Sequence, residues 1–218
     1  MSAERFDLVI VGAGIAGMAL AAAVMQRHTD WRVALLEKDP SPALGPSGQA
    51  AAFLCLTYPD TIRRRLAERA HALLEQQDRE PRSPLRLARV GGVHWRGVAA
   101  LEEPREALFN AYLFADLMWY RAHYGGVIFH FRQAMQGWET ERGAVTAAYG
   151  STARWPCDRL VLATGVDSVA WWRAARTEDG SAAAPGALQP VHVARIPVHW
   201  PAGSAGAAEG HLLVDEDV

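Results

Sequence analysis

The sequence Asp7-Leu-Val-Ile-Val-Gly-Ala-Gly-Ile-Ala-Gly17 decides the fold of this 218-residue chain. Its first five residues form a β-branched run typical of a strand buried on both faces. A G-x-G-x-x-G pattern follows at once, and the alanine-rich residues 18–27 indicate a helix. Residues 31–37, Trp-Arg-Val-Ala-Leu-Leu-Glu, predict a second buried strand. Together these segments predict one right-handed βαβ unit.

The glycine turn and the acid after it have the chemistry of a dinucleotide site. Gly12 permits the tight turn, Gly14 lets the backbone approach a pyrophosphate, and Gly17 lets helix and strand pack closely. The helix N-terminus then offers N–H groups to the phosphates. Glu37 ends the second strand, where a carboxylate would accept hydrogen bonds from the adenosine ribose and disfavour a 2′-phosphate. The alternative is that Glu37 only ends the strand and faces water.

Composition excludes several other classes of protein. The chain has 22 basic and 24 acidic residues, so it carries no overall basic footprint for nucleic acid. Cys55 and Cys157 form no Cys-x-x-Cys pattern, and the eight histidines show no His-x-x-x-His spacing, so we expect neither a disulfide framework nor a metal. The apolar residues 8–25 contain the three motif glycines, so we interpret them as strand and helix and expect no membrane span. A cytoplasmic location is the default.

Further along the chain, the pattern predicts a loop, two helices and several strands. The loop covers residues 39–48, the helices 61–77 and 108–123, and the strands 127–131, 135–139, 143–149 and 159–163, with further β structure over 85–98. In a nicotinamide-dependent dehydrogenase the β-α alternation would continue directly after Glu37. Here a Gly/Pro/Ser loop follows instead, which makes an NAD-dependent reductase the weaker reading.

Four stretches of the chain resemble the D-amino-acid-oxidase-like (DAO) family of FAD-dependent oxidoreductases. They are the N-terminal glycine motif with Leu35-Leu-Glu-Lys38, the small-residue loop Gly45-Pro-Ser-Gly-Gln-Ala-Ala-Ala52, the helix that ends at Gly125-Gly126 and leads towards Met135, and Leu160-Val-Leu-Ala-Thr-Gly165. The resemblance spans roughly residues 6–170. It implies FAD, and because the loop around Ser47 holds no histidine, it implies non-covalent FAD. The implied cofactor contacts are Gly12, Ala13, Gly14, Ile15, Gly17, Glu37, Lys38, Ser47, Gln49, Ala50, Met135, Ala163, Thr164 and Gly165.

The resemblance also implies an activity. Family members transfer a hydride from a carbon that bears an amine nitrogen to flavin N5, and the resulting imine hydrolyses; no side-chain base is obligatory, so no catalytic residue is named. The loop at Pro46 with Tyr58-Pro59 soon after looks most like the tRNA-modifying members, which act on the wobble-uridine side chain in 5-methylaminomethyl-2-thiouridine biosynthesis. The substrate is therefore expected to be a small amine or a modified tRNA.

We expect an α/β fold, a three-layer Rossmann-like FAD-binding domain with a parallel sheet and a partial mixed-β substrate region. The predicted FAD domain comprises residues 1–58 and 105–170, and the substrate region 59–104 and 171–218. The late segment that closes over the flavin in the family has no counterpart by residue 218. The alternative function is accordingly a catalytically incomplete FAD-binding remnant or subunit, with a partner chain that completes the substrate domain.

Overall fold

A four-stranded parallel sheet organises the first of two compact units, residues 1–49 and 115–192. The structure is a computed structural model that describes residues 5–50, 52–81, 83–96, 99–171 and 212–215. The strand order is β12-β1-β2-β8. The strands are β1 (Leu8–Val11), β2 (Val33–Leu36), β8 (Ile128–His130) and β12 (Leu160–Leu162). Ile10 pairs with Val161 on one side and with Leu35 on the other, so β1 is a central strand.

The predicted βαβ unit is present, with an earlier helix start than expected. Helix α1 (Ile15–Arg27) connects β1 to β2 and begins inside the glycine motif, three residues before the predicted start at residue 18. A second helix, α4 (Ala111–Tyr124), precedes β8, and its residues Ala115, Met118 and Ala122 are buried. The loop predicted over residues 39–48 contains a short helix, α2 (Pro46–Gln49).

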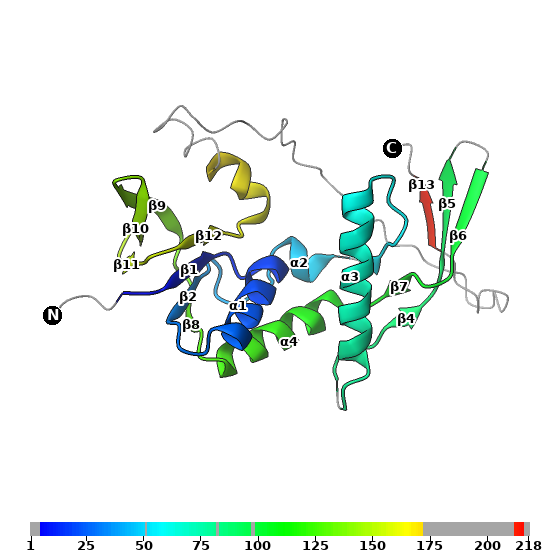
Figure 1. The fold of residues 1–218 in the computed structure, drawn as a ribbon, viewed down its shortest axis with the longest axis horizontal. Coiled ribbons are helices and arrows are strands. Elements are labelled where there is room, and N and C mark those ends of the chain that lie inside the picture. The colour runs from blue at the N-terminus through cyan, green and yellow to red at the C-terminus, as the bar shows by residue number, and fades with distance from the viewer. Residues whose placement is uncertain (1–4, 51, 82, 97–98, 172–211, 216–218) are drawn as a thin grey trace. The chain divides into compact units, whose positions relative to one another are not determined.

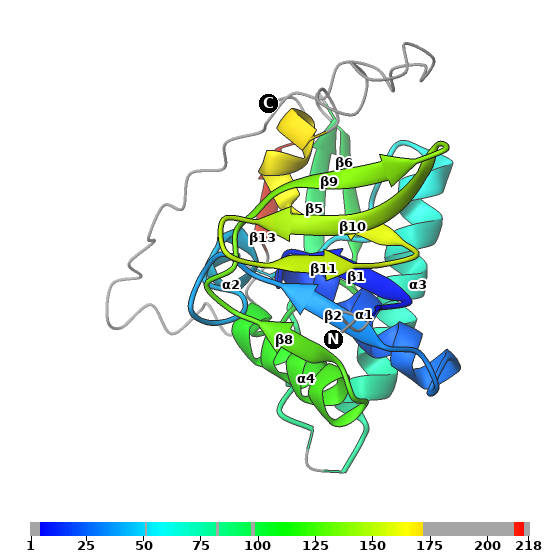
Figure 2. The same ribbon diagram turned by 90° about the vertical axis from the view of Figure 1, so that its left-hand side faces the viewer.

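Three layers build this unit. An antiparallel meander of β9 (Met135–Glu141), β10 (Ala144–Gly150) and β11 (Arg154–Pro156) covers one face of the parallel sheet, and α1 and α4 cover the other (Figure 2). Alternate strand residues point to opposite faces. Val9, Val11, Ala34 and Leu36 therefore pack in one cluster with three meander residues, Met135, Ala148 and Trp155, and with Cys157, which directly follows β11. Ile10 and Leu35, fully buried, face the helices.

The second unit comprises residues 50–114 and 193–218 and carries two small sheets. One has the order β3-β7-β4 and is antiparallel; the other has the order β13-β5-β6 and is mixed. The long helix α3 (Thr61–Asp78) belongs to this unit (Figure 1). It begins after Asp60, whose side chain accepts a hydrogen bond from the N–H of Arg63. The strands are β3 (Phe53–Leu54), β4 (Ala88–Arg89), β5 (Gly92–Arg96), β6 (Ala99–Glu103), β7 (Ala107–Leu108) and β13 (Leu212–Asp215).

The predicted fold class is confirmed: an α/β unit with a parallel sheet is joined to small mixed-β sheets. The predicted domain boundaries stay a prediction. Most of the predicted substrate segment 171–218 lies outside the described residues. Among the helices of the described ranges, none combines the length and the apolar character needed to cross a bilayer.

Candidate functional site

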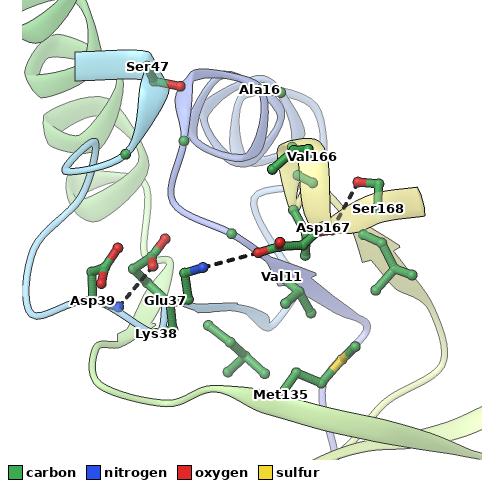
Figure 3. A pocket seen from close by; sticks show the side chains of 18 of the residues that line it. Val11, Ala16, Glu37, Lys38, Asp39, Ser47, Met135, Val166, Asp167 and Ser168 are labelled. Atoms are coloured by element: carbon green, nitrogen blue, oxygen red, sulfur yellow. Dashed lines mark hydrogen bonds and ion pairs between the residues drawn. The ribbon is translucent and has the colours of Figure 1, made fainter. Parts of the chain in front are cut away.

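A pocket of about 880 Å³ opens where the strand order of the parallel sheet reverses. The chain runs from β1 to β2 on one side, while β12 returns on the other side of β1. Open α/β sheets bind ligands in the crevice at the carboxyl ends of such strands. The pocket is lined by the glycine turn after β1, by the end of β2 and by the segment after β12 (Figure 3).

The glycine turn brings three backbone segments into contact. Gly12 has a φ of +105°, and a Cβ atom there would lie 2.5 Å from the carbonyl oxygen of Ala163. A Cβ on Gly17 would lie 1.9 Å from the carbonyl oxygen of Gly12. Only glycine therefore lets the turn, the first turn of α1 and the end of β12 approach one another as they do. The roles predicted for Gly12 and Gly17 agree with this geometry.

The side chain of Glu37 is held by two backbone N–H groups. One carboxylate oxygen accepts from Ala13 at 2.6 Å and the other from Asp39 at 2.9 Å. A carboxylate has about four lone-pair positions, so each oxygen keeps capacity for a further donor such as a ribose hydroxyl. The two bonds fix the carboxylate at the pocket wall, beside the glycine turn (Figure 3).

Ser47, from the short helix α2, lies at the N-terminus of α1. Its hydroxyl oxygen accepts a hydrogen bond from the N–H of Ile15 at 3.0 Å, and it would lie 3.1 Å from a Cβ placed on Gly14. The group that approaches Gly14 in this structure is thus a hydroxyl of the chain itself. The hydroxyl oxygen occupies the kind of acceptor position that a phosphate oxygen takes at a helix N-terminus.

An ion pair joins two edges of the pocket. Lys38 Nζ lies 3.0 Å from Asp167 Oδ2, with the two side chains 62% and 53% exposed (Figure 3). The hydrogen bond to Asp167 raises the pKa of Lys38 above its ordinary value. Asp167 belongs to a 3₁₀ turn, Gly165–Asp167, directly after β12. The sequence prediction stopped at Gly165 and missed this acid, which follows the Thr-Gly turn by only two residues.

The structure gathers most of the predicted cofactor contacts in this one pocket. Ten of them line it: Gly12, Gly14, Ile15, Glu37, Lys38, Ser47, Met135, Ala163, Thr164 and Gly165. Four are not lining residues. Ala13 is buried and contributes its N–H to Glu37, Gly17 packs against the turn, the side chain of Gln49 donates to the carbonyl of Leu44, and Ala50 belongs to the second unit. That these residues contact FAD stays a prediction.

The pocket also has lining residues that the sequence did not indicate. Val11, Leu36 and Leu162 come from the ends of three adjacent strands and make an apolar floor. Gln133 and Ala134 come from the segment between β8 and β9, and the N–H of Gln133 donates to the carbonyl of Glu37 at 2.8 Å. These positions belong to no motif, because strand pairing brings them together from distant parts of the chain.

Part of the chain matches a known protein family. Residues 7–96 match the family model DAO, FAD dependent oxidoreductase. The search of curated protein sequences returned no match. Among solved structures, the chain is similar to L-proline dehydrogenase from P. horikoshii, with a TM-score of 0.69, 15% identity, and coverage of 82% of this chain and 56% of that chain.

Two further solved structures have the same fold. Glycine oxidase from Bacillus cereus ATCC 14579 has a TM-score of 0.65 at 17% identity, covering 76% of this chain and 57% of that chain. L-amino acid deaminase from Proteus vulgaris, with its specific insertion sequence deleted, has a TM-score of 0.69 at 16% identity, covering 79% and 56%. This chain therefore spans somewhat more than half the length of these structures. The family model supports the predicted DAO resemblance and confirms the prediction of FAD as the cofactor.

Proposed function

We propose that this chain binds FAD non-covalently in the 880 Å³ pocket and forms the cofactor-binding part of an oxidoreductase that oxidises a C–N bond. The observation that carries the proposal is the convergence of three features in that pocket: the glycine turn, the acid Glu37 and the end of β12. The match to the family of FAD-dependent oxidoreductases supports it.

The residues of the pocket fit a dinucleotide. Its volume lies in the range of small-molecule and cofactor sites, about 300–1,000 Å³. The carboxylate of Glu37 would hold the ribose, and the N-terminus of α1 with Ser47 would hold the pyrophosphate. The Lys38–Asp167 pair is more than half exposed, so a ligand that separates it loses no more than about 1 kcal/mol.

When bound, FAD supplies a hydride acceptor for a carbon that bears an amine nitrogen. The chain's own residues then have three tasks: to bind the cofactor, to orient it, and to exclude water from the apolar floor of Val11, Leu36 and Leu162. No catalytic side chain is assigned. A small amine or amino acid is the general substrate class, and the wobble-uridine side chain of a tRNA is its more specific version.

The alternative is an FAD-binding subunit that needs a partner chain for catalysis. Both functions require FAD in the same pocket, so they differ only in whether the bound flavin can be reduced by a substrate.

Anaerobic reduction of the reconstituted chain separates the two. The FAD complex is mixed with glycine, L-proline, N-methylated amines or undermodified tRNA, and loss of the oxidised flavin absorbance is followed. Bleaching by any of these supports the oxidoreductase. An FAD complex that bleaches with dithionite but with none of these substrates supports the subunit. A chain that binds no FAD overturns both.

A further inference from the structure

We propose that Cys55, His94 and Glu106 form a binding site for a divalent transition-metal ion of the zinc class. The three residues belong to the second unit and offer one ligand atom each, and these atoms all lie within 4.8 Å of one another. Cys55 directly follows β3, His94 lies in β5, and Glu106 directly precedes β7. The site is separate from the proposed FAD pocket and does not depend on it.

The pair His94–Glu106 is buried and oriented. Nε2 of His94 lies 2.7 Å from Oε2 of Glu106, and the two side chains are 1% and 0% exposed. Oε1 of Glu106 accepts two backbone hydrogen bonds, from Leu56 at 2.7 Å and Thr57 at 3.2 Å. The backbone thus holds one carboxylate oxygen and leaves the other directed at the imidazole. Supporting hydrogen bonds of this kind fix the ligands of metal sites in their productive orientation.

Gly92 leaves the space in which these atoms meet. A Cβ at Gly92 would lie 1.7 Å from Oε2 of Glu106 and 3.0 Å from Nε2 of His94. Every other residue type would therefore displace the carboxylate oxygen. Glycine at position 92 therefore allows the buried carboxylate of Glu106 and the buried imidazole of His94 to lie within hydrogen-bonding distance of each other.

The donor set fits Zn²⁺ in type, charge and spacing. Thiolate and imidazole select zinc over magnesium or calcium, and a thiolate together with a carboxylate balances the two positive charges. Ligand atoms around tetrahedral zinc lie roughly 3.4–3.6 Å apart. To bind the ion, His94 Nε2 and Glu106 Oε2, now 2.7 Å apart, would have to separate by less than about 1 Å. The thiol of Cys55, which donates a hydrogen bond to the carbonyl of Thr57, would lose its proton to the solvent.

The cluster has an access route. His94 lines a cavity of about 470 Å³ whose other lining residues include Tyr58, Arg64 and Arg105. Three protein ligands leave the fourth position of a tetrahedral ion open, as in zinc sites that bind water or a substrate. The cavity lining also includes Glu68 and Glu103, and Arg105 is paired with Glu103 at 2.8 Å, so the charges of the lining balance and a neutral water molecule suits the fourth position.

The three ligands have no close spacing in the sequence, which is why the absence of Cys-x-x-Cys and His-x-x-x-His patterns predicted no metal. Cys55 and His94 are 39 positions apart, and His94 and Glu106 are 12 apart. The pairing of β3 with β7 brings Cys55 near Glu106, and the backbone hydrogen bonds from Val90 and Gly91 to the carbonyl of Glu106 bring the start of β5 there. Neither contact leaves a local motif.

Cobalt titration of the full chain tests the proposal. The chain is dialysed against EDTA and titrated with Co²⁺, which takes zinc sites and reports a thiolate ligand through a near-ultraviolet charge-transfer band. We expect one equivalent of cobalt, the thiolate band, and displacement of both by Zn²⁺. Because the chain has only two cysteines, the variants are decisive. Cys157→Ser keeps the band and is the matched control, whereas Cys55→Ser loses it.

A second variant keeps the test independent of folding. Glu106→Gln retains a carbonyl oxygen for the N–H groups of Leu56 and Thr57 but removes the charge, and should weaken zinc binding about 10- to 100-fold. Zinc should also protect Cys55 of the unaltered chain from alkylation. A folded wild-type chain that binds no cobalt, or a Cys55→Ser variant that keeps the band, overturns the proposal and leaves the cluster as a hydrogen-bonded structural contact.

Discussion

Replacing Gly17 with alanine tests whether the close contact between α1 and the glycine turn holds the site together. The new Cβ would lie 1.9 Å from the carbonyl oxygen of Gly12, 3.2 Å from its carbonyl carbon, and 3.4 Å from the Cβ of Ala163. Two of these are backbone atoms, so a side-chain rotation cannot relieve the contact. The helix must move away from the end of β1.

The magnitude follows from two opposing effects. Overpacking of this kind costs about 1–3 kcal/mol, and a contact with rigid backbone belongs at the upper end. Alanine returns about 1 kcal/mol through its higher helix propensity. The net loss of unfolding free energy is about 2 kcal/mol, which lowers Tm by about 4–8 °C in a chain of this size. Because the N–H groups of the first turn of α1 also move, FAD affinity should fall about tenfold or more.

Thermal unfolding by circular dichroism, with and without FAD, measures both effects. Gly45→Ala is the matched control, because Gly45 lines the same pocket and a Cβ there would have no neighbour within 4 Å. This variant should change stability by less than about 0.5 kcal/mol. Equal Tm values for Gly17→Ala and Gly45→Ala would refute the reasoning, because the contact would then carry no constraint.

Three further predictions concern single side chains. Glu37→Ala should weaken FAD binding about 10- to 100-fold in a fluorescence titration, through loss of ribose hydrogen bonds, and unchanged affinity would show that Glu37 does not hold the ribose. Burial lowers the pKa of His130 below its ordinary value of 6.5, so the unfolded chain takes up a proton that the fold disfavours, and stability falls as pH drops from about 6.5 towards the folded-state pKa. Between about pH 7.5 and about pH 5.5, the Tm of His130→Gln should fall by less than the Tm of the wild type. Equal decreases in Tm for the two proteins would contradict this. Burial also raises the pKa of the Cys157 thiol, so iodoacetamide should label Cys55 before Cys157 in peptide mass mapping; the reverse order would show that Cys157 is accessible.

The fold could be predicted where the chain's signals are local. The apolar runs that precede Gly12 and Ala163 are the strands β1 and β12. The strands predicted at residues 135–139 and 143–149 are the antiparallel pair β9 and β10, with Arg142 and Gly143 of the turn between them at positive φ. The alanine-rich residues predict a helix from residue 18, yet α1 begins at Ile15, whose N–H donates to the hydroxyl of Ser47 from a distant segment. Tertiary contact overrides propensity at this helix end.

In the candidate site too, residues in local motifs could be predicted and residues brought in by strand pairing could not. Gly12 and Glu37 could be found because a glycine turn and the end of the next strand have a fixed spacing. Asp167 and Gln133 could not, because they reach the pocket only through the parallel pairing of β12 with β1 and of β8 with β2. The cluster of Cys55, His94 and Glu106 lies still further from any sequence signal, since three separate segments contribute one residue each.

The central claim is that the pocket at the ends of β1 and β12 binds FAD. Titration of the purified chain with FAD, followed by flavin absorbance and fluorescence with NAD as competitor, tests it most directly. We predict one equivalent of FAD bound with a Kd of about 1 μM or tighter, corresponding to about −8 kcal/mol, without competition from NAD. A folded chain that binds no FAD, or that binds NAD in its place, would contradict the claim.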